Sequence, residues 1–246
     1  MRTFSLWALL PPIFSVGTAA GLWMVYFVAL YNEKVVAMSS EYRGKNGSLY
    51  PPFISVTGNF PPASCFFSQV MNMGAFLGFV IGLLRYLQLK KKIEKPWLNY
   101  VSAAGFLMGC FGMTLVGNFQ LFEEMLIHNI GTLMTFGLGT VYCWMQSYIT
   151  LKVNLSNEGK AVAIIRFLLS AAITICVALK YALLLNPDKM HAARCQWALV
   201  MFFLAFFGTF SVEFRHFHVD MTVDNLEHPV SQFESSDVFR QHLEQL

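Results

Sequence analysis

The stretch from Pro61 to Lys95 constrains the fold more than any other part of the sequence, because it has the pattern of one membrane crossing. It opens with a Pro-Pro pair and Cys65, runs through a long apolar segment and ends in a group of basic residues. A transmembrane helix needs about 20 predominantly apolar residues, and lysine and arginine gather on the cytosolic side of such helices. The stretch therefore predicts a helix over residues 65–89 that ends at the cytosol.

The same stretch carries a ridge of small residues. Gly74, Gly78 and Gly82 follow one another at four-residue steps, so they share one face of the predicted helix. Such a face allows a second helix to approach closely. We predict a helix-packing ridge here, and through it the association of several copies of the chain into a homo-oligomer.

Composition indicates that the rest of the chain is also a membrane protein. The sequence is 56% hydrophobic and 13% charged, whereas a soluble domain carries about 25% charged residues. A net charge of +3 is too small to suggest nucleic acid as a partner. We predict an all-α polytopic membrane protein with a six-span transmembrane domain over residues 1–215. The predicted spans cover about residues 4–31, 65–89, 97–117, 127–151, 163–186 and 195–214.

The first span has an alternative interpretation as a signal peptide, because Arg2 precedes it. The apolar part of a signal peptide has about 7–15 residues, and residues 4–31 form a much longer run, which favours a retained helix. With six spans, the connections predicted to lie inside carry most of the lysines and arginines, so we place both termini in the cytosol. The polar residues 216–246 are predicted to form a disordered cytosolic tail.

Two features are expected on the outer side. Asn46 begins an Asn-Gly-Ser sequence in the long loop 32–64, which is an acceptor for N-glycosylation. Cys65 and Cys195 both begin spans at the outer face and could form a disulfide there. On the inner side, a group of lysines is explained by positive-inside topology, and the alternative is that it contacts anionic lipid. This group comprises Lys90, Lys91, Lys92 and Lys95.

Candidate functional residues are mainly amides near the outer leaflet. No Asp or Glu lies near the centre of a predicted span, which argues against a proton- or sodium-coupled transporter. The amides could join helices by hydrogen bonds or line a polar pathway. They are Gln69, Asn72, Asn118, Gln120 and Asn129, with His128 beside them and Gln146 nearer the cytosol.

Charged residues near the outer face allow two interpretations as well. Glu123 and Glu124 form an acidic loop that is either simply exposed or the cation-concentrating mouth of a pathway. Lys180 is expected to extend its ammonium group to the membrane interface. We find no metalloprotease, hydrolase or phosphate-loop motif, so neither an enzyme nor a cofactor is predicted. A pair of His128 with either glutamate could act as acid and base only if the loop folded back.

Several motifs resemble one known family. The segments PPASCFFSQVMNMGAF (61–76), VGNFQ (116–120), IHNIGTLMTFGLGT (127–140), TLKVN (150–154) and FGTFSVEFRH (207–216) resemble the DRAM (damage-regulated autophagy modulator) and transmembrane protein 150 family. Together they are most similar to its tentonin branch. The resemblance implies a six-span protein of the plasma membrane and the endosomal and lysosomal membranes, with both termini in the cytosol.

The resemblance also implies a function. The tentonin branch is associated with mechanically activated, slowly inactivating, calcium-permeable cation currents, so we expect a component of such a channel, either its pore or a subunit. Other branches are linked to autophagy and to scaffolding of phosphoinositide kinase, and a more distant relative takes part in remodelling lipid anchors. The alternative is therefore a non-conducting membrane regulator. Expected partners are the lipid bilayer and further copies of the chain or other channel subunits.

Overall fold

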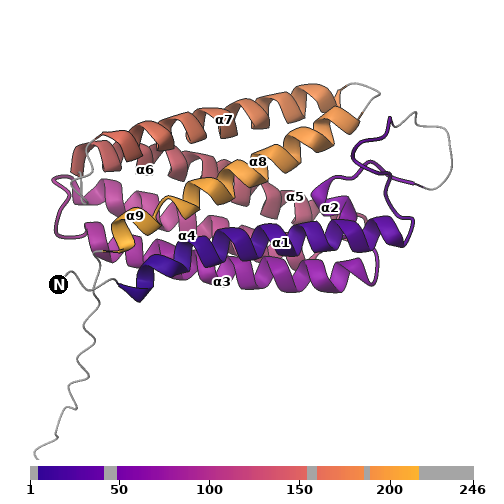
Figure 1. Ribbon diagram of the computed structural model, residues 1–246, viewed down its shortest axis with the longest axis horizontal. Coiled ribbons are helices and arrows are strands. Elements are labelled where there is room, and N and C mark those ends of the chain that lie inside the picture. The colour runs from indigo at the N-terminus through magenta and orange to yellow at the C-terminus, as the bar shows by residue number, and fades with distance from the viewer. Residues whose placement is uncertain (1–4, 42–48, 154–159, 186–188, 216–246) are drawn as a thin grey trace, which may run out of the picture.

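The computed structural model describes residues 5–41, 49–153, 160–185 and 189–215. Figure 1 shows that the long helices lie side by side in an elongated bundle. The elements in chain order are η1 (Leu6–Leu9), α1 (Leu10–Tyr31), α2 (Ile54–Thr57), α3 (Ala63–Leu89), α4 (Pro96–Asn118), α5 (Met125–Leu133), η2 (Met134–Leu138), α6 (Gly139–Val153), α7 (Ala161–Leu184), α8 (Met190–Gly208) and α9 (Ser211–Phe214).

Within the described residues, five helices are long and apolar enough to cross a membrane. They cover Leu6–Tyr31, Ala63–Leu89, Pro96–Asn118, Ala161–Leu184 and Met190–Phe214. This confirms a multi-pass membrane protein. The predicted span 127–151 coincides with the succession α5, η2 and α6, in which η2 is a π-helical segment. That interruption separates two shorter helices, so the sixth span stays a prediction.

The prolines near the start of two long helices mark where those helices begin. Pro11 and Pro12 occupy the first turn of α1, after the 3-10 turn η1, and Pro96 opens α4. Proline fits the first turn because the missing N–H has no intrahelical partner there and its fixed φ suits a helix. The pair Pro11 and Pro12 therefore lies in the first turn of α1. Val25 and Ala29 of this helix are buried against the rest of the bundle.

The connections between the long helices alternate between two ends. At one end, which we call the Ser5 end, the Ser5 amide donates to the carbonyl of Arg215 at 3.4 Å, and the connections α3–α4 and α6–α7 lie there too. The opposite α2 end holds α2 and the connections α4–α5 and α7–α8 (Figure 1). Every connection predicted to be cytosolic lies at the Ser5 end. Which end faces the cytosol stays a prediction.

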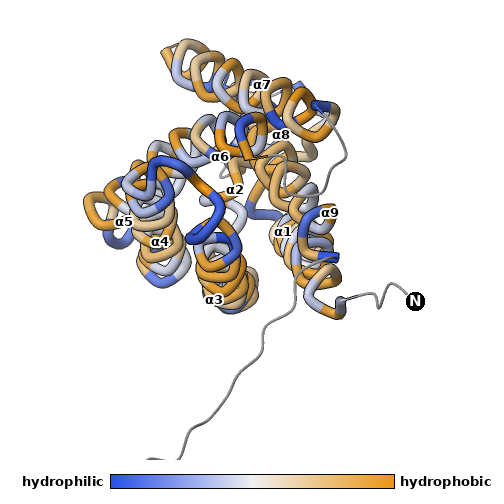
Figure 2. Tube along the Cα trace, turned by 90° about the vertical axis from the view of Figure 1, so that its left-hand side faces the viewer, coloured by the Kyte–Doolittle hydropathy of each residue, from blue (hydrophilic) through white to orange (hydrophobic). Residues whose placement is uncertain are grey.

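Hydrophilic residues mark the Ser5 end. Figure 2, which faces this end, shows them in the connection between α3 and α4, in front of helices that are mostly hydrophobic. Lys90, Lys91, Lys92 and Lys95 are all exposed. Their ammonium groups are therefore accessible to solvent or to lipid headgroups, as the predicted lipid contact requires.

The glycine ridge of α3 packs inside the chain. Gly74, Gly78 and Gly82 are all buried. A Cβ added to Gly74 would lie 3.3 Å from the side chain of Met113, one added to Gly78 would lie 3.3 Å from that of Cys110, and one added to Gly82 would lie 2.6 Å from that of Phe106, all in α4. In the structure these three glycines lie against α4 of the same chain. The predicted use of this ridge between copies of the chain is wrong, because α4 of the same chain already covers it.

A buried charge cluster and a lysine-lined pocket at opposite ends of the bundle

Three charged side chains from different helices meet at the Ser5 end. Arg166 of α7 donates from Nη1 and Nη2 to the two carboxylate oxygens of Glu213 in α9, each at 2.6 Å. Nη2 of Arg85 in α3 lies 3.3 Å from Glu213 Oε1. The side chains are 2% exposed or less. This charge cluster therefore joins α3, α7 and α9 through a buried, two-pronged ion pair, the geometry in which arginine binds a carboxylate most strongly.

Neutral groups satisfy most of the remaining donors of the two guanidinium groups. Arg85 donates from Nε to Gln146 Oε1 at 3.0 Å and from Nη1 to Gln88 Oε1 at 2.8 Å. Arg166 donates from Nε to Thr209 Oγ1 at 2.9 Å. The Thr150 hydroxyl accepts from Nη1 of Arg166, the nitrogen that also donates to Glu213. The cluster is thus a network in which most of the buried donors have partners, the condition under which a buried polar group is tolerated.

The cluster contains two positive charges and one negative charge. Both guanidinium groups lie over the ring of Phe210, whose centroid is 4.4 Å from Arg166 Cζ and 5.1 Å from Arg85 Cζ. The face of an aromatic ring attracts a cation. Phe210 therefore helps to offset the positive charge that Glu213 leaves unpaired.

The cluster corrects the sequence interpretation of its members. The lysines and arginines that the sequence assigns to the inner side include Arg85 and Arg166, and Glu213 lies at the end of the predicted span 195–214. In the structure Arg85 is 1%, Arg166 0% and Glu213 3% exposed. Each lies at the helix end nearest the predicted cytosol, so charge counting cannot distinguish it from a loop residue. An acid within the apolar run FGTFSVEF was the signal that could have identified the cluster.

The amides of the predicted polar pathway lie in separate places. Gln146 accepts a hydrogen bond from Arg85 of the charge cluster and donates from Nε2 to Ser102 Oγ at 3.0 Å. Asn72 and Asn118 lie near the α2 end and bind each other, and Gln69 is exposed. Gln120 is half-buried, and its carbonyl accepts from the amides of both glutamates of the α4–α5 loop. The structure therefore does not gather these residues around one path.

Asn72, Asn118 and Ser68 form a small hydrogen-bonded group between α3 and α4. Asn72 Nδ2 donates to Asn118 Oδ1 at 2.9 Å, Asn118 Nδ2 donates to Asn72 Oδ1 at 3.2 Å, and Ser68 Oγ donates to Asn118 Oδ1 at 2.8 Å. The reciprocal pattern satisfies both amides within the chain. It has the geometry of a contact that joins two helices.

Replacing Asn118 is expected to have a small effect, because this group is partly exposed. Asn118→Ala should reduce the free energy of unfolding by about 0.5–1 kcal/mol, the usual value of such a bond between membrane helices. The matched control is Gln69→Ala, which removes an exposed amide of α3. Unfolding of the purified protein in micelles measures both. Equal stability of the two variants would contradict a joining role.

His128 has both ring nitrogens occupied at the α2 end. Its Nδ1 lies 2.7 Å from the carbonyl oxygen of Phe119, and its Nε2 lies 2.9 Å from the Ser55 hydroxyl. Because a carbonyl can only accept, Nδ1 carries the proton, and in a neutral ring Nε2 accepts from Ser55. His128 thus joins α5 to α2 and to the α4–α5 loop. Glu123 and Glu124 are exposed, and the histidine is bonded to neither of them.

A pocket of about 390 Å³ opens at the α2 end. Its lining includes Lys180 of α7, Asn129 of α5 and Lys189, which precedes α8. Neither Glu123 nor Glu124 lines it. Lys180 is 8% exposed, so protein covers most of its side chain, and the extension of its ammonium group to the membrane interface stays a prediction. The charge that lines this pocket is therefore positive, which differs from the acidic mouth predicted there.

The predicted disulfide and glycosylation site have different outcomes. Cys65 and Cys195 are free cysteines, so the predicted pairing is absent from the structure. Asn46 and the predicted tail 216–246 lie outside the described residues. Over the described ranges, no group of three or more His, Cys, Asp or Glu side chains is placed to hold a metal ion.

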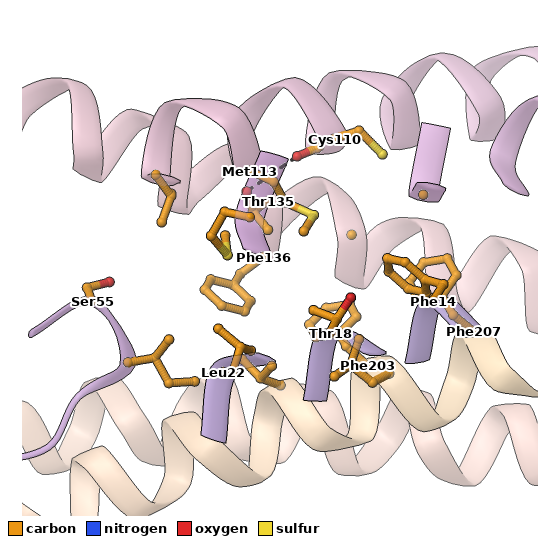
Figure 3. Close-up of a pocket in the computed structure, with 18 of the residues that line it drawn as sticks. Phe14, Thr18, Leu22, Ser55, Cys110, Met113, Thr135, Phe136, Phe203 and Phe207 are labelled. Atoms are coloured by element: carbon orange, nitrogen blue, oxygen red, sulfur yellow. Dashed lines mark hydrogen bonds between the residues drawn. The ribbon is translucent and has the colours of Figure 1, made fainter. Parts of the chain in front are cut away.

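The middle of the bundle, between the charge cluster and the pocket, is apolar. It contains a cavity of about 90 Å³, and Figure 3 shows Phe14, Phe136 and Phe207 among the side chains around it. The rings of Phe106, Tyr142 and Phe207 stack nearby, with centroids 4.3 to 5.8 Å apart. Ser55 and Gln196 line both this cavity and the pocket at the α2 end. An apolar cavity of such a size stays dry, so it provides no water-filled path from these residues to the charge cluster.

Comparison with known proteins identifies the family. A model of the Frag1/DRAM/Sfk1/Cwh43P N-terminal domain matches residues 6–217. The chain is 36% identical to a protein named modulator of macroautophagy TMEM150B from Xenopus tropicalis over 218 residues, which cover 87% of this chain and 90% of that protein. It is 33% identical to the human protein of that name, over 84% of this chain and 85% of that one.

A second group of relatives agrees with this result. The chain is 30% identical to transmembrane protein 150A from Mus musculus over 239 residues, which cover 90% of this chain and 88% of that protein. No solved structure matches the chain. The matched region contains all the described helices, including the charge cluster and the lysine-lined pocket. The chain belongs to the Frag1/DRAM/Sfk1/Cwh43P family and, within it, to the DRAM and transmembrane protein 150 proteins.

Proposed function

We propose that this chain is a non-conducting, non-enzymatic membrane protein that modulates macroautophagy. The observation that carries the proposal is the similarity, over most of the chain, to proteins named modulators of macroautophagy. The geometry of the bundle supports it, because an aromatic and apolar middle separates the polar groups at its two ends. We place the protein in the plasma membrane and in endosomal and lysosomal membranes.

We propose that the Ser5 end is the cytosolic, regulatory end. The exposed lysines of the α3–α4 connection would contact anionic headgroups, each contributing about 1 kcal/mol near the surface. Glu213 lies in α9, close to the point where the chain continues into the tail 216–246. By joining α9 to α3 and α7, the charge cluster would hold the start of the tail at a constant position beside the lysines.

Autophagic flux in cells that lack the chain tests this proposal. Full-length protein should restore flux, whereas a chain ending at Arg215, or one with Lys90, Lys91, Lys92 and Lys95 all changed to Gln, should restore it less. The control changes Lys34, which is exposed near the α2 end, to Gln. Full restoration by both test variants, at equal surface and lysosomal abundance, would overturn the proposal.

A second candidate is the channel subunit that the resemblance to the tentonin branch implies. The observation in its favour is the π-helical segment η2, whose Phe136 lines the central cavity. An irregular helix beside an incompletely filled core is a place where membrane tension could favour an alternative packing. Such a switch would operate in a subunit that modulates another pore as well as in a pore of several chains.

Recordings from purified protein in bare lipid vesicles under graded suction distinguish the two candidates. The first predicts no current when folded protein is present in the vesicles. Suction-activated current whose cation selectivity changes in the Glu123→Gln/Glu124→Gln variant would instead support a conducting chain with an acidic outer mouth. The control variant for this measurement is Glu94→Gln, which removes an exposed acid at the Ser5 end.

A further inference from the structure

The pocket at the α2 end has the chemistry of an anion-binding site. It lies between the segment 50–56, α5, α7 and α8, at the α2 end of the bundle (Figure 1). Its volume of about 390 Å³ falls in the range of small-molecule sites. The lining includes Lys180 and Lys189 and no Asp or Glu from the described part of the chain.

The surroundings of the Lys180 ammonium group are the main evidence for an anion-binding site. Lys180 is 8% exposed, and none of the described residues forms a hydrogen bond or an ion pair with its ammonium group. Its described neighbours are aromatic rings, with Tyr181 at 4.8 Å and Phe136 at 6.0 Å from Nζ. Among the described residues, the fully buried polar side-chain atoms without a partner are Asn99 Oδ1 and Tyr142 OH. The Lys180 ammonium is not one of them, so it reaches the open space of the pocket.

A second donor accompanies it. Gln196 of α8 is 4% exposed and accepts from the amide of Ile54 through Oε1 at 2.9 Å. This bond orients the side chain and leaves the Nε2 hydrogens without an acceptor among the described residues. Ser55 is already bonded to His128, so it is not available in the same way. Donors from α7 and α8 therefore line one pocket without a carboxylate to accept from them.

The surroundings of the pocket identify the source of the anion. Leu179 and Tyr181, next to Lys180, are exposed on α7, one of the helices apolar enough to cross a membrane, so they face lipid. Lys180 lies one helical turn before Leu184, the last residue of α7 at the α2 end, and headgroups are expected near the ends of a membrane-spanning helix. Leu184 and Val56 line the same pocket, which gives it an apolar side. We propose that this pocket binds the phosphate group of a membrane phospholipid, with Lys180 as its charged partner and Gln196 as a further donor.

Binding of short-chain lipids to the purified full-length protein in micelles tests the proposal. Dioctanoyl phosphatidic acid should bind, and dioctanoyl glycerol, which lacks the phosphate, should not. Lys180→Met should weaken binding of phosphatidic acid about tenfold or more, because it removes a charge-assisted hydrogen bond. Lys180→Arg keeps the charge and should retain most of the affinity. Lys160→Met is the matched control, because Lys160 is exposed at the opposite end of the same helix.

The melting temperature separates loss of binding from loss of folding. Without lipid, Lys180→Met should melt at or above the temperature of the unsubstituted protein, because a methionine no longer buries an unpaired charge. With phosphatidic acid, the unsubstituted protein and Lys160→Met should melt higher, and Lys180→Met should not. Unchanged affinity in Lys180→Met would overturn the proposal. Inorganic phosphate that binds as tightly as phosphatidic acid would overturn the assignment to a lipid.

Discussion

Glu213→Gln is expected to reduce the free energy of unfolding by about 3–5 kcal/mol, the usual cost of removing one partner from a buried ion pair. The substitution preserves the shape of the side chain but removes its charge. It leaves the guanidinium groups of Arg85 and Arg166 buried beside each other without a carboxylate. Unfolding of the purified protein in micelles, followed by helical circular dichroism, measures the effect.

Two further variants make this prediction specific to the pairing. Glu94→Gln removes an exposed acid at the same end of the bundle and should change stability by less than about 0.5 kcal/mol. Combining Glu213→Gln with Arg85→Met should recover part of the loss, because the number of unpaired buried charges falls. A single Glu213→Gln variant as stable as Glu94→Gln would show that the ion pair contributes nothing to the fold.

Gly112→Ala is expected to destabilise the bundle by about 1–3 kcal/mol through overpacking. A Cβ at Gly112 of α4 would lie 2.7 Å from the carbonyl oxygen of Gly131 in α5, and one at Gly131 would lie 2.8 Å from the carbonyl oxygen of Gly112. Backbone atoms cannot rotate away as the end of a side chain can. The two helices must therefore separate, which also disturbs the bond from Thr135 to Gly109 at 3.3 Å.

Gly105→Ala is the matched control, on the same helix two turns away. A Cβ added at Gly105 meets no atom within 4 Å. Glycine within a helix is destabilising relative to alanine, so Gly105→Ala should raise the free energy of unfolding by roughly 0.5–1 kcal/mol. Opposite signs for the two substitutions would identify close backbone approach, rather than helix propensity, as the reason for Gly112. If both variants were more stable than the unsubstituted protein, the contact between α4 and α5 would not require glycine at position 112.

The membrane fold could be predicted from local patterns. The apolar runs and the glycine spacing of α3 each predict a feature that the structure contains. The functional residues were harder to recognise because the sequence shows the type of a residue but not its surroundings. Arg85 resembles the nearby Lys90 in any count of basic residues, yet Arg85 is buried against Glu213 and Lys90 is exposed.

The sequence by itself determined the class of this protein, the approximate positions of the five long apolar helices that the structure describes and its family. These properties depend on hydrophobicity and on short-range spacing, which a linear pattern contains. The tertiary structure alone decided that Gly82 faces α4 of the same chain, that Glu213 joins Arg85 and Arg166, and that Lys180 rather than Glu123 lines the pocket. Each of these depends on which helix faces meet, and that is decided by packing between residues far apart in the chain.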